Sequence, residues 1–316
     1  MSGEIPTENE VLEYFTTLSN WGRWGEDDQL GTLNLITPQK RVQAARLVQQ
    51  GIAIGCSRPV TRDMDSDAAN PPPVHFMVES GEGWVTPAGP GRGPRQIASD
   101  FFGMVFHGIT VTHIDALSHI FWDGKMYNGR PAEAVTASQG ATEHSIESLK
   151  DGVMTRGVLL DIARLRGKEW LEGGEPVLPE DLEAAERAQG VSVEEGDALC
   201  LRLGWYKRRN QMGPAPRPIG RPGLHAATLP WLRERGVALI AADASQDVHP
   251  SGYEKVDIPV HQVGIVAMGL WLVDSANFEE LAERCQELNR WEFMFTLAPI
   301  RFPGITGSPL TPLALL

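Results

Sequence analysis

Three histidines and one aspartate fall within thirteen residues of this chain, although the whole sequence of 316 residues contains only eight histidines. The stretch reads His107-Gly-Ile-Thr-Val-Thr-His113-Ile-Asp115-Ala-Leu-Ser-His119. Imidazole and carboxylate groups are common ligands of catalytic divalent metals, and a further imidazole can transfer protons near neutral pH. The stretch therefore predicts a metal site with a proton-transfer group beside it.

The spacing within the stretch assigns a role to each residue. A strand over residues 109–115 would place His113 and Asp115 on one face, because side chains alternate along a strand. His119 follows Asp115 by four residues and can fold back over it on one helical or tight turn. We predict that His113 and Asp115 bind the metal and that His119 is the general acid or base. In the alternative interpretation, the histidines only satisfy backbone groups where a strand enters a polar loop.

The remaining ligands must come from elsewhere in the chain, since a catalytic zinc usually takes three protein ligands and keeps one position open. His261 is the predicted third ligand, because it heads an apolar run that ends at Asp274, itself a second candidate. In a regular strand, His107 would lie roughly 20 Å from His113. We therefore predict that His107 contacts substrate, unless a bulge at Gly108 brings it closer to the metal.

The elements that must position these residues alternate irregularly, with several strands adjacent in sequence, which is typical of a mixed α/β or α+β domain. We expect one domain over residues 1–316. Thr37 is a predicted helix N-cap, with Pro38 in the first turn and Gly51 as the C-terminal stop. Residues 61–98 are predicted to form a long loop rich in proline and glycine. Predicted helices cover 8–19, 38–50, 179–189, 226–235 and 278–287, and predicted strands cover 52–60, 109–115, 157–162, 237–242 and 292–300, with a further strand within 196–204.

Two turn signals follow the histidine stretch, at Asp123-Gly124 and at Asn128-Gly129. A hairpin there would bring Trp122 and Tyr127 near the histidines, and we predict that both contact substrate. Together with Trp21 and Trp24, these aromatic residues favour a cyclic or aromatic small molecule as the ligand. A basic cluster at 207–209 is predicted to be a solvated surface turn.

Composition narrows the class of protein. The formal charge is −13 and the sequence pI is about 5.1, and no basic stripe occurs, so we expect neither a nucleic-acid partner nor an anionic membrane surface. Three cysteines lie far apart, which argues against a disulfide framework and favours a reducing, cytoplasmic compartment. The chain contains no phosphate loop, dinucleotide fingerprint or serine-hydrolase elbow.

The segment Thr112-His113-Ile-Asp115-Ala-Leu-Ser-His119 resembles the signature His-x-Gly-Thr-His-x-Asp-x-Pro-x-His of the metal-dependent cyclase family. That family includes bacterial kynurenine formamidase, isatin hydrolase and a zinc-dependent dienelactone hydrolase. The resemblance extends to 23–34, to 157–161, to 196–205 and to the segment that begins at His261. It implies a swivelling β/β/α fold, a homodimer or homotetramer, metal ligation by His113 and Asp115, and acid–base catalysis by His119.

The chain departs from this signature at several positions. The first metal-binding histidine of the family falls on Ile109, which cannot bind a metal, and the signature glycine and proline fall on Val111 and Leu117. The late acid of the family falls on Val273, one residue before Asp274. These departures favour one divalent ion, zinc or manganese, over two.

The resemblance and the residues together imply one ion held by His113, Asp115 and His261. The expected activity is opening of an amide or lactone by a metal-activated water, as in an arylformamidase, with His119 as the acid or base. Two alternatives remain open. One is a metal-independent cyclase or dehydratase that uses His119 and His107 as acid and base, and the other is a non-catalytic relative that binds a small molecule.

Overall fold

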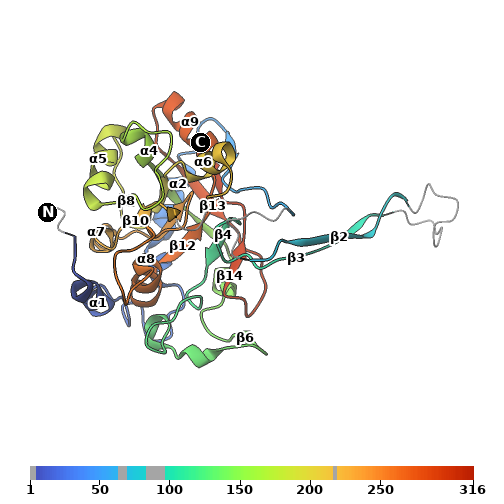
Figure 1. The fold of residues 1–316 in the computed structure, drawn as a ribbon, viewed down its shortest axis with the longest axis horizontal. Coiled ribbons are helices and arrows are strands. Elements are labelled where there is room, and N and C mark those ends of the chain that lie inside the picture. Colours follow the sequence, from blue (N-terminus) through green and yellow to red (C-terminus); the bar gives the residue numbers. More distant parts are fainter. Residues whose placement is uncertain (1–4, 63–69, 83–96, 216–218) are drawn as a thin grey trace.

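A nine-stranded mixed sheet forms the centre of the fold (Figure 1). The computed structural model describes residues 5–62, 70–82, 97–215 and 219–316. The strand order is β1-β15-β13-β7-β9-β11-β12-β4-β14. The strands are Ala53–Gly55 (β1), Leu313–Leu315 (β15), Glu292–Leu297 (β13), Val153–Asp161 (β7), Ala198–Arg202 (β9), Leu239–Ala242 (β11), Trp271–Asp274 (β12), His113–Asp115 (β4) and Gly307–Pro309 (β14).

The middle of the sheet is parallel, from β7 through β9 and β11 to β12. Nearly every residue of these strands is buried, as expected for parallel strands that are covered on both faces. Helices connect the strands and pack around the sheet (Figure 1). They are Glu8–Thr17 (α1), Pro38–Ala45 (α2), Ile162–Leu165 (α4), Pro179–Gln189 (α5), Trp205–Met212 (α6), Thr228–Arg235 (α7), Pro259–His261 (α8) and Glu279–Leu288 (α9), with a π-helix (η6) at Gln262–Met268 and short 3₁₀ turns at Gly31–Leu35, Tyr127–Gly129, Ala132–Ala134 and Ile146–Leu149.

Two short antiparallel strands complete one edge of the sheet. β4 pairs with β12 so that His113 lies opposite Asp274, and β14 pairs with β4 so that Gly307 lies opposite Asp115. Directly opposed residues of an antiparallel pair point to the same face, with Cβ atoms about 5 Å apart. This register brings residues that are distant in sequence to one place. Among the described residues, no helix is long and apolar enough to cross a bilayer.

The fold confirms the predicted mixed α/β class, and several local signals hold. α5 has the predicted bounds, and the Thr37 side chain caps α2 by accepting the Lys40 N–H. α2 ends at Ala45 rather than near residue 50 as predicted. The reason is a long-range contact, because the N–H groups of residues 50 and 52 donate to the Leu316 carbonyl and draw this segment beside the C-terminal strand.

The prediction of one long loop over 61–98 is wrong for its middle part. Val74–Glu79 forms strand β2, which pairs antiparallel with β3 (Ser99–Gly103) in an arm that projects from the body (Figure 1). Residues 63–69 and 83–96 lie outside the described residues. The short strand β2 lies between a proline-rich and a glycine-rich segment, so its apolar alternation is a weak signal in the sequence. Its partner strand β3 follows the glycine-rich segment.

Two further predictions need correction. The basic cluster at 207–209 lies within α6 rather than in a turn. The predicted strand over 109–115 is limited to His113–Asp115, because the backbone bends at the preceding residues. The C-terminal segment contains strands β14 and β15. Short two-stranded ladders also join β5 (Val135–Thr136) to β6 (Gly140–Ala141) and β8 (Pro176–Val177) to β10 (Gly223–Leu224).

Candidate metal centre

A cavity of about 180 Å³ lies at the sheet edge formed by β4 and β12. Residues from five separate parts of the chain line it, among them Arg221 and, on β12, Asp274. The histidine stretch contributes from β4 and the turn after it, and two further groups come from the segment after β11 and from α8. The polar side chains of its lining include His113, Asp115, His119, Asp247, His261 and Asp274.

Asp115 is at the centre of this cluster, and its two carboxylate oxygens face different histidines. Three imidazole nitrogens converge on Oδ1: His107 Nδ1 at 2.9 Å, His113 Nε2 at 3.5 Å and His119 Nε2 at 3.8 Å. The other oxygen, Oδ2, lies 3.5 Å from His261 Nε2 and has no hydrogen-bond partner although it is buried. A buried carboxylate oxygen without a partner is costly unless a cation or a proton donor completes its surroundings.

His261 and Asp274 lie on the buried side of Asp115. The imidazole of His261 contacts Asp247 Oδ2 through Nδ1 at 2.5 Å, and its Nε2 lies 3.4 Å from Asp274 Oδ2. Gln246 donates its side-chain amide to Asp274 Oδ1 at 3.0 Å. Both groups are therefore held in place by side chains of the segment that follows β11.

Two groups of side chains could each hold an ion, and both include Asp115. His113, Asp115 and Asp274 form one group, and His107, Asp115 and His119 form the other, with ligand atoms within 4.8 Å of one another in each. Nitrogen and oxygen donors of this kind suit zinc or manganese. The donor set and the unpartnered Asp115 oxygen thus fit a divalent cation, and the fit does not choose between metals.

The charges within the cluster shift the pKa values of its members in opposite directions. Burial lowers the pKa of His119 to about 4, although the Asp115 carboxylate opposes this. Burial would also lower the pKa of His261, but the carboxylates of Asp274, Asp115 and Asp247 around it raise it well above its usual range. For His113, burial is likewise outweighed by Asp115, so its pKa is raised.

Asp115 shows the complementary shift. Burial would raise the pKa of its carboxyl group, but the imidazoles of His119 and His113 and the hydrogen bond from His107 hold it well below its usual range. Asp115 therefore stays ionised near neutral pH, as a metal ligand must.

The structure places His107 differently from the regular strand assumed for it. Its ring centroid is 5.3 Å from that of His113, rather than the distance of roughly 20 Å that an extended strand would give. Gly108 provides the bend, with a φ of +149° that other residues rarely adopt. The ring of His107 stacks on that of His119, with centroids 3.8 Å apart.

The turns after the histidines form as predicted, but their aromatic side chains point elsewhere. Positive φ angles at Asp123 and Gly124 form a tight turn bridged by Trp122 and Lys125. Trp122 stacks on Phe15 with ring centroids 4.3 Å apart. The buried Tyr127 donates its hydroxyl to Asp28 Oδ2 at 3.0 Å. Neither aromatic residue is among the described residues that line the cavity.

Several residues of the site escaped the sequence prediction. Asp247, Ser245 and Arg221 line the cavity, and Thr306 contacts His107. One signal for the first two was available, because the polar run that includes them directly follows a buried strand, where parallel sheets commonly place ligand-binding groups. Thr306 had no such signal, since it reaches the site only through the pairing of β14 with β4.

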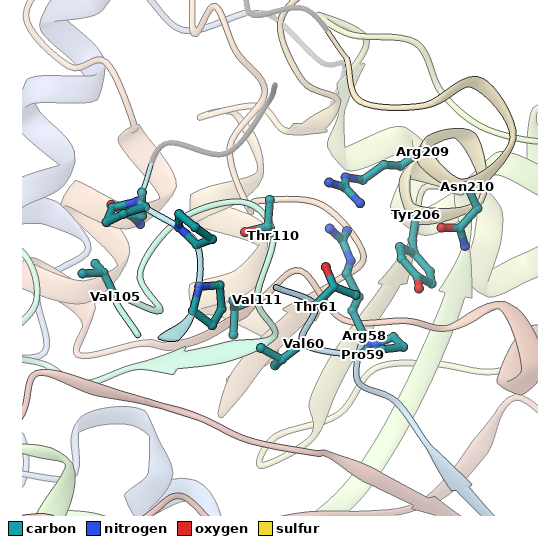
Figure 2. Close-up of a pocket in the computed structure, with 14 residues that line it drawn as sticks. Arg58, Pro59, Val60, Thr61, Val105, Thr110, Val111, Tyr206, Arg209 and Asn210 are labelled. Atoms are coloured by element: carbon teal, nitrogen blue, oxygen red, sulfur yellow. The ribbon is translucent and has the colours of Figure 1, made fainter. Parts of the chain in front are cut away.

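A second cavity of about 150 Å³ borders Thr110 and Val111, which precede His113 in the chain (Figure 2). Arg58, Thr110 and Tyr206 line it. The guanidinium of Arg58 donates to the carbonyl oxygens of Ile109 and Asp243, and it packs over the ring of Tyr206. Ile109 lines the first cavity and the next two residues, Thr110 and Val111, line the second, so one short segment lies between the two cavities. Arg58 holds this segment through its hydrogen bond to the Ile109 carbonyl oxygen.

Comparison with known proteins assigns the family. Residues 39–246 match the model of the family described as "Putative cyclase". The crystal structure of a novel cyclase is 34% identical to this chain and has a TM-score of 0.86, with 96% of this chain and 99% of that chain covered. No curated protein sequence matches the chain.

More distant structures share the fold. Isatin hydrolase A from Labrenzia aggregata, bound to benzyl benzoate, is 16% identical with a TM-score of 0.59, covering 83% of this chain and 93% of that chain. An isatin hydrolase bound to the product analogue thioisatinate is 15% identical with a TM-score of 0.59, covering 89% and 99%. A predicted metal-dependent hydrolase from Bacillus stearothermophilus is 12% identical with a TM-score of 0.50, covering 83% and 97%. The family match over most of the chain and the shared fold establish that this chain belongs to the "Putative cyclase" family.

Proposed function

We propose that this protein is a metal-dependent hydrolase that opens an amide or a lactone, in the manner of an arylformamidase. The observation that carries the proposal is the arrangement around Asp115, whose ionised carboxylate has one oxygen facing three imidazoles and the other buried without a partner. The shared fold with isatin hydrolases and with a metal-dependent hydrolase supports the same reaction class.

We assign one divalent ion, zinc or manganese, to His113, Asp115 and His261, with Asp274 as an additional donor. Such an ion would lower the pKa of a bound water to near neutrality and polarise the scissile carbonyl group. Asp247 holds the ring of His261 and the Val111 carbonyl holds that of His113, so each has Nε2 directed to the cluster. Hydrogen bonds of this kind fix the tautomer and orientation of metal-binding histidines.

His119 is the proposed general acid and base. Its Nε2 lies 3.8 Å from Asp115, and no described residue forms a hydrogen bond with either ring nitrogen. A neutral imidazole in this position can take a proton from water as the carbon–oxygen bond forms, and return it to the leaving nitrogen or oxygen as the scissile bond breaks.

The proposed substrate is a small cyclic or aromatic amide or lactone. The structural relatives named above bind benzyl benzoate and thioisatinate, both of which are aromatic. A cavity of about 180 Å³ that is lined by His119 and the predicted ligands suits a ligand of this size better than a polymer. We retain His107 as a residue close enough to contact substrate, whereas Trp122 and Tyr127 would need to leave their present contacts to do so.

Metal analysis and a chelation assay test the proposal. Protein produced with added zinc or manganese should carry about one ion per chain, and less than about 0.3 ion per chain would contradict the assignment. A panel of isatin-like cyclic amides, aromatic lactones and N-formyl aromatic amines should include a substrate whose turnover is lost on chelation and restored by metal. Turnover that survives chelation would instead favour the metal-independent alternative with His107 and His119 as acid and base.

We also propose that the protein forms a homodimer or homotetramer, and the β2–β3 arm supports this. One face of the arm carries Val74, Phe76 and Phe101, all exposed, with the two phenylalanine rings stacked 4.9 Å apart. The other face carries an ion pair between His75 and Asp100 together with the exposed side chains of Met77 and Phe102. A two-stranded ribbon is only marginally stable alone, so an apolar face of this kind requires a cover.

The arm can be tested by changing each face separately. Phe76→Ser combined with Phe101→Ser should lower the molar mass measured by light scattering, because it removes the apolar contact. Asp100→Ser, on the opposite face, is the matched control and should leave the mass unchanged. A wild-type protein that is monomeric at micromolar concentration would contradict the proposed assembly.

A further inference from the structure

Three of the four histidines around Asp115 share one hydrogen-bond pattern. In each of these histidines, one ring nitrogen forms a hydrogen bond with an oxygen on the side away from Asp115, and the other ring nitrogen faces the Asp115 carboxylate. His113 uses the Val111 carbonyl at 2.8 Å, His261 uses Asp247 at 2.5 Å, and His107 uses the Thr306 hydroxyl at 3.1 Å. Metal-binding histidines nearly always have such an outer partner.

His119 lacks an outer partner of this kind among the described residues, although its ring stacks on that of His107. The hydrogen-bond pattern therefore separates two neighbouring rings with similar exposure, 22% for the side chain of His107 and 26% for that of His119. By this criterion His107 groups with the predicted ligands, and His119 alone keeps both nitrogens available for proton transfer.

The ring of His107 packs where neighbouring backbone leaves room for it. A Cβ atom on Gly307 would lie 2.6 Å from His107 Cε1, so only glycine fits opposite Asp115 without displacing that ring. Gly108 supplies the bend, and Asn70 donates its side-chain amide to the His107 carbonyl oxygen. The neighbouring Gly108 and residues from two distant parts of the chain thus determine where this imidazole lies.

Ile109, two residues after His107, lines the cavity at Asp115 and has no atom that can bind a metal. We propose that His107 is a ligand of the ion at Asp115, in the place that Ile109 cannot fill, and that Thr306 positions it. The Thr306 hydroxyl can accept the Nε2–H of His107, which leaves the Nδ1 lone pair directed at Asp115 and available to a cation. This inference rests on the proposed metal-dependent function of the same site.

Metal affinity provides the test, independent of any substrate. Purified protein is stripped with a chelator and titrated calorimetrically with zinc or manganese, and its cobalt derivative is measured by visible absorption. His107→Ala should weaken binding by about 100-fold or more and change the cobalt spectrum, and Thr306→Val should weaken it by about 10-fold or more. His75→Ala is the matched control, because it removes an exposed histidine of the arm and should leave affinity and spectrum unchanged.

A relocated ligand separates a direct role from a structural one. Ile109→His in the His107→Ala background should restore at least part of the lost affinity, since Ile109 lines the cavity beside Asp115 and an imidazole there could bind the ion. Wild-type affinity in His107→Ala, with loss in His113→Ala, would overturn the role of His107 and leave the proposed function intact. Absence of metal binding in the wild-type protein would overturn both.

Discussion

The two sides of Asp115 differ in burial and in how their histidines are held. On the inner side, His113, His261 and Asp274 have side chains at most 9% exposed and are tied to backbone or carboxylate groups. On the outer side, His107 and His119 form a parallel stack with an interplanar angle of 2°, and both reach solvent. The Asp115 carboxylate thus connects a buried group of side chains to a partly exposed one.

The difference indicates how the work of the site is divided. A group sealed from water and held by several partners is suited to fixing a cation, because it cannot readily exchange protons with solvent. A partly exposed imidazole without an outer partner can exchange them, as a general acid or base must. His107 combines features of both sides, since it is partly exposed but oriented by Thr306. The predictions below test this division, beginning with the largest expected effect.

Asp115→Asn should abolish the site, because Asp115 is the residue that contacts both sides. The amide cannot supply the negative charge that a divalent ion requires. In addition, its NH₂ group is a donor, whereas the imidazoles around position 115 face an acceptor oxygen in the wild-type protein. We expect metal content near zero and, since a catalytic metal contributes several kcal/mol, a loss of about 1,000-fold or more in kcat/KM. Metal content is measured by mass spectrometry, and kcat/KM is measured on a cyclic amide or lactone.

The control for this change is Asp151→Asn, which alters an exposed aspartate in a turn. It should retain full metal content and turnover. A folded Asp115→Asn protein that keeps its metal would show that the two sides do not depend on this carboxylate.

His119→Ala should separate chemistry from binding. Because no described residue holds the ring of His119 by a hydrogen bond, its removal should leave metal content unchanged, while kcat falls by about 100-fold or more through loss of general acid–base catalysis. Both quantities are measured on the same preparation. Loss of metal together with activity would place His119 among the ligands and remove the distinction between it and His107.

Stability against pH should distinguish the sides in protein stripped of metal. The pKa of His119 is lowered from 6.5 to about 4, so the unfolded chain binds more protons over that interval and the free energy of unfolding falls as pH drops through it. The pKa of His113 is raised, so its contribution is complete below its unfolded pKa and is lost as pH rises through its folded pKa.

The variants should therefore act on opposite limbs of the pH profile. In chelator, His119→Gln should flatten the fall in stability between about pH 6.5 and 4, and His113→Gln should flatten the fall above pH 6.5. Urea unfolding from pH 4 to 9 measures both limbs. An equal effect of the two substitutions on one limb would mean that the histidines share one environment.

Local sequence signals predict those elements that are stabilised by residues only a few positions away in the chain. The proline and acidic residues at the start of α5 and the Thr37 cap of α2 act within a few residues, so both starts could be predicted. The same holds for His113, Asp115 and His119, whose proximity follows from one strand and one turn. The histidine cluster could therefore be predicted from thirteen residues.

What could not be predicted depends on pairings between distant segments. Asp274 lies opposite His113 only because β4 pairs with β12, and Thr306 reaches His107 only because β14 adds to the same edge. The spacing between His261 and Asp274 is also altered by a π-helix, which takes one residue more per turn than an α-helix would.

The smallest expected effect concerns Tyr127, which is not part of the metal cluster. Its hydroxyl donates to Asp28, which also accepts the N–H groups of Leu30 and Gly31. Tyr127→Phe removes one hydrogen bond and leaves Asp28 with other donors, so the free energy of unfolding should fall by only about 1 kcal/mol. Because Tyr127 is buried and faces away from the cavity, KM should remain within about twofold of the wild-type value, a change of less than about 0.5 kcal/mol. Urea unfolding and steady-state kinetics measure the two quantities, and a large rise in KM with unchanged stability would instead place Tyr127 against the substrate, which requires a rearrangement of the turn at Asn128.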